Sequence, residues 1–168
     1  MQFLLADVGR EEKVYALRLA DVLLAVGGKI DHPALVDFQR RHKYQLMAHS
    51  PELARQLGAL AAQAGSRPLP GLLSEYEALF STALKQKATA RKNANVLQHM
   101  LGYFKKQLDD FEKRELLAAI ENYRLNLVPL IVPLTLLKHY IAKFRQPYLQ
   151  DQHYLDPHPL ELKLRNHA

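Results

Sequence analysis

The spacing of apolar residues between 72 and 108 constrains the fold more than any other feature of this chain. A four-three repeat places such residues on one face of an α-helix. The stripe consists of Tyr76, Phe80, Ala83, Lys87, Ala90, Ala94, Leu97, Leu101, Phe104 and Leu108, with Lys87 as its only charged member. No useful length of the chain alternates with period two, as a strand would. The sequence predicts an all-α protein with a long helix from Leu72 to about Leu108, either continuous or broken near Ser81 to Lys85.

Prolines, glycines and capping residues divide the first 71 residues into three predicted helices. Serine favours the N-cap, proline the first helical turn and glycine the position after the last turn. The first helix covers residues 10–26, with Val14, Leu17 and Leu24 on one face and Gly27 and Gly28 as its stop; the second begins near Pro33 and carries Leu35, Phe38 and Leu46; the third runs from Ser50 and Pro51 to Gly65. Residues 65–71, GSRPLPG, are predicted to form a loop.

The C-terminal third contains two more predicted helices and a tail. Asp109 and Glu112 have the spacing of a capping box. The helix that follows is predicted to bury Leu116, Leu117, Ile120, Tyr123 and Leu127, and another helix is expected from Pro133 to Phe144. After Gln146 and Pro147 the tail is predicted to be mostly irregular. A chain of 168 residues fits one domain over residues 1–168. We therefore expect a bundle of about six helices with a partly irregular C-terminal tail.

The composition excludes several classes of function. The chain has no cysteine, which excludes disulfides, thiol nucleophiles and cysteine-bound metal clusters and suits a reducing cytoplasm. Its eight histidines contain no zinc-binding pair at helical spacing, so neither a metal nor another cofactor is expected. The most apolar stretch, residues 125–137, is too short and too broken by prolines to span a membrane.

Positive charge is concentrated in one part of the sequence. No acidic residue occurs between Glu77 and Asp109. The cations of this window are Lys85, Lys87, Arg91, Lys92, Lys105 and Lys106, and their summed charge equals the formal net charge of the whole chain, +6. On a continuous helix Lys87, Arg91 and Asn95 lie 40° apart along one edge of the apolar stripe, with Gln98, His99 and Gly102 on the same side. Such a line of cations and amides favours contact with phosphates and sugars or bases. The alternative is a solvated helix face from which Lys87 reaches water.

Further candidates lie outside this window. In residues 39–51 these are His42, Lys43 and His49. For His49 one alternative is a structural role, in which it bonds a backbone carbonyl or packs between helices, and the other is contact with a phosphate or substrate. Tyr148, Tyr154 and His158 of the tail either stack on bases or close the core. The full set of predicted nucleic-acid contacts is Lys87, Arg91, Lys92, Asn95, His99, Tyr103, Lys105, Lys106, His42, Lys43, His49, Lys138 and His139.

Several motifs resemble one known family. The segments HKYQLMAHSP, NVLQHMLGYF, PLIVPLTLLKHY and QPYLQDQHYLDPHP are similar to the YbgA-like family, a bacterial domain of unknown function, and the resemblance spans the chain from about Val14 to His167. Members occur alone or fused behind a desulfidase domain of the thiouracil desulfidase type. One departure is Asp151, where relatives tend to have glycine.

The resemblance implies a role in RNA binding. In fused relatives the partner domain uses a cysteine-bound iron-sulfur cluster to remove sulfur from 4-thiouridine in tRNA, and the YbgA-like part is regarded as a tRNA-binding module. The present chain has no cysteine, so the desulfidase activity does not carry over. Standalone members are associated with photolyase in genome context, which suggests a link to 4-thiouridine photodamage. We therefore expect a cytoplasmic, non-catalytic binder of structured RNA, with tRNA as the first candidate.

Two alternatives remain open at this point. The first is an enzyme acting on a nucleotide or modified nucleoside, with His99 as its acid-base group and Lys87 as an electrostatic stabiliser. The second is a partner that docks onto a separate desulfidase or repair protein through its basic face.

Overall fold

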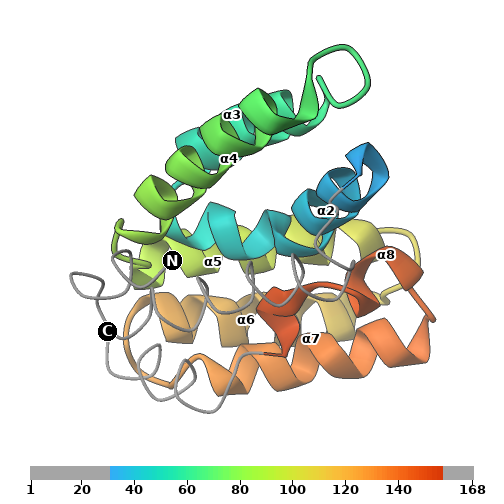
Figure 1. Cartoon of the computed structure of the whole chain (residues 1–168). Coiled ribbons are helices and arrows are strands. Elements are labelled where there is room, and N and C mark those ends of the chain that lie inside the picture. Colours follow the sequence, from blue (N-terminus) through green and yellow to red (C-terminus); the bar gives the residue numbers. More distant parts are fainter. Residues whose placement is uncertain (1–30, 157–168) are drawn as a thin grey trace. The chain divides into compact units, whose positions relative to one another are not determined.

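A computed structural model describes residues 31–156, whose elements are all helical (Figure 1). Seven α-helices and two short 3-10 helices lie in this range, and no strand does. The all-α prediction is confirmed. The helix expected at residues 10–26 and the tail residue His158 lie outside the described residues.

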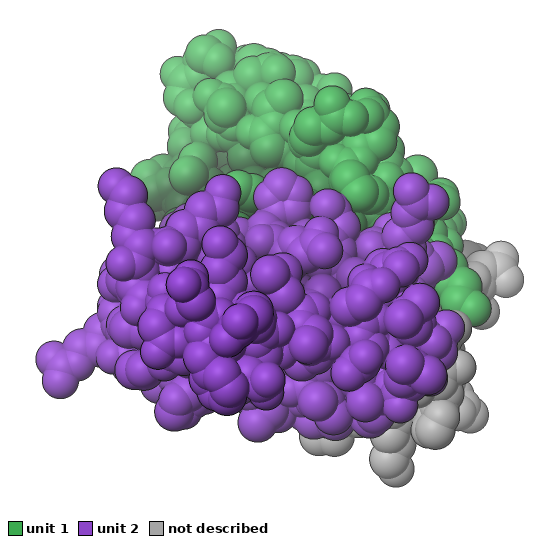
Figure 2. All heavy atoms as spheres, turned by 180° about the vertical axis from the view of Figure 1, so that it is seen from behind, with its two compact units in different colours: residues 1–87 green, residues 88–168 purple. Residues whose placement is uncertain are grey.

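The internal contacts group the chain into two compact units, residues 1–87 and residues 88–168 (Figure 2). The described helices of each unit bury apolar side chains of their own. The expectation of one domain over residues 1–168 stays a prediction.

The first unit contains three described helices: α2 (His32–His49), α3 (Pro51–Ala61) and α4 (Leu69–Leu84). Each of the three pairs of these helices is in contact. Their buried faces supply one apolar cluster, which includes Leu35, Phe38, Leu46, Leu57, Leu72, Tyr76 and Phe80.

Local capping explains where two of these helices begin. The Asp31 side chain accepts a hydrogen bond from the Ala34 N–H at 2.9 Å, and Ser50 Oγ accepts one from the Leu53 N–H at 3.3 Å. The predicted starts near Pro33 and at Ser50 are confirmed. The predicted end of α3 at Gly65 is wrong by four residues, because Gly65 lies in the turn after the helix with a φ of 91°. The loop predicted at 65–71 is also shorter, since α4 begins at Leu69.

The helical stretch predicted from Leu72 to Leu108 is divided, which confirms the alternative of a break near Ser81 to Lys85. Helix α4 ends at Leu84 and α5 (Ala90–Leu101) begins six residues later, with Thr89 as its N-cap. Thr89 Oγ1 accepts a hydrogen bond from the Lys92 N–H at 3.3 Å. A continuous helix would have carried Lys87 on its buried face, where an ammonium group is costly to desolvate. The break leaves Lys87 exposed in the connecting loop.

The second unit continues with η2 (Gly102–Phe104), α6 (Asp110–Arg124), α7 (Ile131–Lys143), α8 (Pro147–Gln150) and η3 (His153–Leu155). Helices α5, α6 and α7 contact one another, and α8 contacts α7. The predicted capping box is confirmed: Asp109 Oδ1 accepts from the Glu112 N–H at 2.8 Å, and Glu112 Oε2 accepts from the Asp109 N–H at 3.1 Å.

Three details of this unit differ from the sequence predictions. Two residues that were expected to be buried by this helix are exposed. Leu117 lies on α6, whereas Leu127, which is 70% exposed, follows the end of the helix at Arg124. Helix α7 begins two residues before Pro133. Pro133 therefore lies in the first turn, where backbone N–H groups have no intrahelical partner, so the N–H that proline lacks is not needed. The tail after Gln146 contains two short helices and buries Leu149, Tyr154 and Leu155.

Candidate nucleic-acid interface

Helix α5 separates an apolar face from a polar one. Asn93, Ala94, Val96, Leu97, Met100 and Leu101 are buried. The opposite side carries Arg91, Lys92, Asn95, Gln98 and His99, and the chain then continues through Tyr103 of η2 to Lys105 and Lys106. We call these eight residues the α5 surface. All are exposed except Lys92 and Asn95, which are half-buried. The register predicted for Arg91, Asn95 and Gln98 holds, whereas Lys87 lies in the loop and is not part of this face.

Three cations of the α5 surface have no carboxylate partner in the described part of the chain. Arg91, Lys105 and Lys106 make no ion pair with any carboxylate of residues 31–156. By contrast, three other cations of this unit are paired: Lys143 with Glu112, Arg124 with Glu121 at 2.6 Å, and Lys138 with Asp156 at 3.6 Å. Three unpaired cations of residues 88–156 therefore lie on the α5 surface, and Lys113, Arg114 and Arg145 are unpaired elsewhere in this range.

The N-terminal turn of α5 strengthens the positive potential. It contains Arg91 and Lys92 and no acidic residue. The N-terminus of a helix carries a positive partial charge, so cations placed there are unfavourable by about 0.3–1 kcal/mol each. The same arrangement attracts anions.

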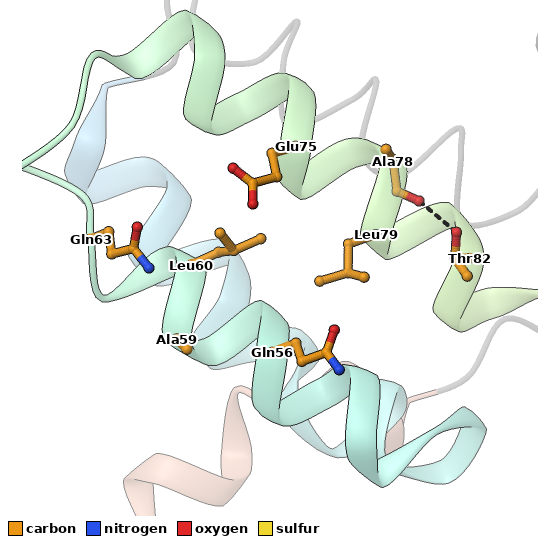
Figure 3. A pocket seen from close by; sticks show the side chains of 8 residues that line it. All are labelled: Gln56, Ala59, Leu60, Gln63, Glu75, Ala78, Leu79 and Thr82. Atoms are coloured by element: carbon orange, nitrogen blue, oxygen red, sulfur yellow. Dashed lines mark hydrogen bonds between the residues drawn. The ribbon is translucent and has the colours of Figure 1, made fainter.

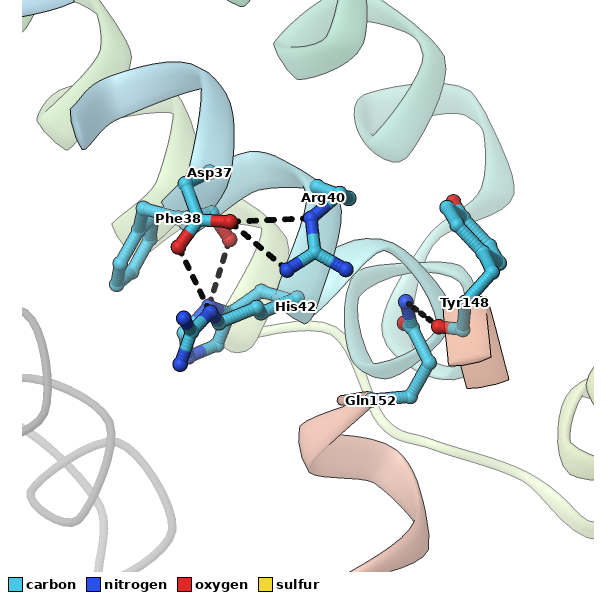
Figure 4. Close-up of polar contacts among 7 residues, drawn as sticks. Asp37, Phe38, Arg40, His42, Tyr148 and Gln152 are labelled. Carbon is cyan, nitrogen blue, oxygen red and sulfur yellow. Dashed lines mark hydrogen bonds and ion pairs between the residues drawn. The ribbon is translucent and has the colours of Figure 1, made fainter. Parts of the chain in front are cut away.

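Two tyrosines stack at the far end of the α5 surface. The rings of Tyr103, from η2, and Tyr148, from α8, are nearly parallel, at an interplanar angle of 10° with centroids 5.7 Å apart. Tyr103 remains 39% exposed. The Gln152 amide donates a hydrogen bond to the Tyr148 carbonyl oxygen at 3.3 Å, within the tail (Figure 4). Lys105 lies close by, since its Cε is 3.8 Å from the position that a Cβ on Gly102 would occupy.

The histidines predicted on α2 are buried. His42 is 1% exposed, stacks on Phe38 at 3.9 Å, and its Nδ1 lies 2.8 Å from the Phe38 carbonyl oxygen (Figure 4). His49 is 2% exposed, and its Nδ1 lies 2.7 Å from the Gln86 carbonyl oxygen. The alternative that His49 bonds a backbone carbonyl is confirmed. Both rings are inaccessible to a ligand on the surface, so we correct their assignment from nucleic-acid contacts to structural residues.

The two arginines of α2 share one carboxylate. Asp37 pairs with Arg40 at 2.8 Å (Figure 4). It also pairs with Arg41 at 2.7 Å. Desolvation acts to raise the pKa of Asp37, but hydrogen bonds and charge from the two arginines outweigh it and lower the pKa below its usual value. Lys43 is exposed, with its Nζ 5.6 Å from the centre of the Tyr44 ring.

The predicted contacts on α7 have partners within their own unit. Lys138 forms the pair with Asp156, and the His139 ring meets Tyr140 edge-on at 5.3 Å. Both side chains are exposed. They remain candidates, with less free charge than the α5 surface.

Asn93, which is not among the predicted site residues, joins the tail to α5. Asn93 is 1% exposed; its amide donates to the Thr89 carbonyl oxygen at 3.2 Å, and its Oδ1 accepts from the Tyr154 hydroxyl at 2.9 Å. The available signal was a polar residue next to Ala94 in an otherwise apolar stripe. For Tyr154, the alternative of closing the core is confirmed.

A groove of about 490 Å³ lies between α3 and α4 in the first unit (Figure 3). Leu60 and Leu79 supply apolar side chains to its lining, and Gln56, Gln63 and Thr82 supply polar ones. Its charged lining residue, Glu75, pairs with Arg67 at 2.8 Å. The groove presents no cation from its lining and is therefore a poor site for phosphates.

Residues 31–156 offer neither a metal site nor a membrane span. No three histidine or carboxylate residues of this range lie close enough together to hold a metal ion. None of its helices combines the length and hydropathy that crossing a bilayer requires.

Comparison with known proteins assigns the family. A family model described as a protein of unknown function (DUF1722) matches residues 43–159. The chain belongs to this family. The uncharacterized protein YbgA of Escherichia coli (strain K12) is 34% identical over 134 residues, which cover 79% of each chain. The resemblance to the YbgA-like family is thereby confirmed. No solved structure matched the chain.

Proposed function

We propose that this YbgA-like protein is a non-catalytic, cytoplasmic binder of structured RNA, with tRNA as the proposed ligand. One observation carries the proposal: Arg91, Lys105 and Lys106 are exposed and have no carboxylate partner among residues 31–156. A protein that needs only solubility usually mixes charges of both signs on its surface. Uncompensated cations on one helix and the turn after it instead favour a polyanion.

Different parts of the α5 surface would have different roles. Arg91, Lys92, Lys105 and Lys106 would contact phosphates, which provides affinity without reading the sequence. Asn95, His99 and Tyr103 present amide, imidazole and phenol groups between these cations, and would approach sugars or bases. Lys87, in the loop before α5, would add one phosphate contact.

The enzymatic alternative, with His99 as acid-base group and Lys87 as electrostatic stabiliser, stays a prediction. His99 lies on α5 and Lys87 in the loop before it. The choice of tRNA, and a link to 4-thiouridine metabolism or photodamage, rest on the family resemblance.

The salt dependence of binding tests this proposal. Affinity for a fluorescently labelled tRNA should fall steeply with salt, with a log-log slope of about −4 if six phosphates of unpaired regions are neutralised. Heparin, a polyanion without bases, serves as a competitor that separates charge from base recognition. A flat salt response would contradict the proposal. Sequencing the nucleic acid that purifies with the protein at low salt would identify the RNA.

A further inference from the structure

The Tyr103 ring stacks on Tyr148 and yet stays partly exposed, which packing in a core does not require. The two rings are nearly parallel, and Tyr103 stays 39% exposed although Phe104, the next residue of η2, is buried. Phe104 and Phe144 already form an internal ring contact in the same unit, with centroids 5.8 Å apart. The Tyr103 ring therefore adds a partly open aromatic surface next to the core.

We propose that Tyr103 is a stacking platform for an unpaired base, with Tyr148 supporting its ring from behind. The inference rests on the proposed function and narrows it: the ligand would be RNA with a flipped, bulged or loop nucleotide, and a perfect duplex would not use this site. Base-paired RNA keeps its bases stacked within the helix, whereas unpaired bases can be splayed onto aromatic side chains.

Two lysines lie on one side of the platform along the chain, and an imidazole lies on the other. Lys105 and Lys106 follow Tyr103 after the buried Phe104, and the Lys105 side chain lies against Gly102. His99 precedes Tyr103 by four residues and is exposed. A nucleotide stacked on Tyr103 would thus have its phosphates near ammonium groups, and this combination of cations with aromatic stacking is typical of proteins that bind single strands.

Support from Tyr148 fixes the orientation of the ring. A lone surface tyrosine samples several rotamers, and binding a base would require one of them to be selected at an entropic cost. Here the Tyr148 ring, carried by α8, limits the positions that Tyr103 can take. Replacing Tyr148 should therefore weaken base stacking less than replacing Tyr103 itself.

The test compares two RNAs and two variants. One RNA is a hairpin carrying 2-aminopurine at an unpaired loop position, and the other is a blunt duplex with the same number of phosphates. Tyr103→Leu removes the ring but keeps apolar bulk, and Tyr103→Phe keeps the ring as the matched control. Thermal unfolding of each variant checks that the fold is intact.

Tyr103→Leu should weaken hairpin binding about 5- to 150-fold, the range expected for loss of one stacked base. Tyr103→Phe should bind like the wild type, and all three proteins should bind the duplex equally. Stacking should quench 2-aminopurine fluorescence with wild type and Tyr103→Phe only. Equal hairpin binding by Tyr103→Leu, or an equal loss for hairpin and duplex, would overturn the platform while leaving salt-dependent RNA binding in place. Absence of salt-dependent binding by the wild type to either RNA would overturn the proposed function and the platform together.

Discussion

The hydroxyl of Tyr154 donates a hydrogen bond of 2.9 Å to Oδ1 of Asn93, and both side chains are buried. The two residues are 61 positions apart in sequence, so the bond fixes the C-terminal tail to helix α5. Because the Asn93 amide also donates to the Thr89 carbonyl oxygen, both ends of the side chain are satisfied.

Tyr154→Phe should destabilise the protein by about 1–3 kcal/mol, because it leaves the buried Asn93 oxygen without its donor. Denaturant unfolding followed by circular dichroism measures the change. Tyr103→Phe removes a hydroxyl from an exposed ring and serves as the control, with little change expected. Equal stability of Tyr154→Phe and wild type would show that the tail is not held by this bond.

Glu112 links the start of α6 to the end of α7, and this link should respond to pH. A hydrogen bond from Lys143 is the main cause that lowers the pKa of Glu112, and the bond from the Asp109 N–H adds to it; the same contact with Glu112 raises the pKa of Lys143. A carboxylate whose pKa is depressed in the folded state stabilises it above its unfolded pKa of about 4.3, and this contribution is lost as the pH falls through the folded value.

Glu112→Gln should therefore lower the Tm at neutral pH, and the difference from wild type should shrink as the pH falls below about 4.3. Glutamine can replace glutamate in a capping box, so the helix start is preserved and the ion pair alone is removed. Glu115→Gln, which removes a charge on the same helix at a residue without an ion pair in the described part of the chain, is the control. A difference in Tm that is constant with pH would argue against the pair.

Arg145 adopts a left-handed backbone conformation, with a φ of 48°. It follows the last turn of α7, where the Gln146 N–H bonds the Ile141 carbonyl at 3.1 Å and the Arg145 N–H bonds the Ala142 carbonyl at 3.2 Å. These two bonds form a Schellman motif, which favours glycine at the left-handed position.

Arg145→Gly should raise the free energy of unfolding by about 0.5–1 kcal/mol, because relief of the left-handed strain outweighs the greater freedom of glycine in the unfolded chain. Arg145→Ala removes the same charge but keeps the strain, so it should give no such gain. The midpoints of urea unfolding compare the three proteins. A larger gain for alanine than for glycine would show that the arginine charge, and not the backbone, is unfavourable.

The starts of several helices could be predicted from sequence because their causes are local. Ser50 and the capping box of Asp109 and Glu112 act within three residues of the positions that they cap. The break between α4 and α5 was only one of two alternatives, because the local pattern does not decide between them. Ala83 and Ala90 are seven positions apart, which is close to two helical turns, so the apolar stripe keeps its phase across a segment that is not helical.

The candidate site was partly predictable. The absence of acidic residues between Glu77 and Asp109 is a property of the sequence, and three of the cations there indeed make no ion pair with a carboxylate among residues 31–156. The stacking of Tyr103 on Tyr148 is a tertiary contact, which no local pattern specifies. The burial of His42 could have been predicted, because it lies four positions from both Phe38 and Leu46 on the buried face of α2.

The most direct test of the account is the salt dependence of RNA binding by two charge variants. One replaces Arg91, Lys105 and Lys106 with glutamine. The control replaces Arg41, Arg55 and Arg124, each of which is paired with a carboxylate, and lowers the formal net charge by the same three units. We predict that the first variant reduces the magnitude of the log-log slope by about 2 to 3, while the control leaves the slope nearly unchanged. Equal slopes for the two variants, or a wild-type slope near zero, would contradict the account.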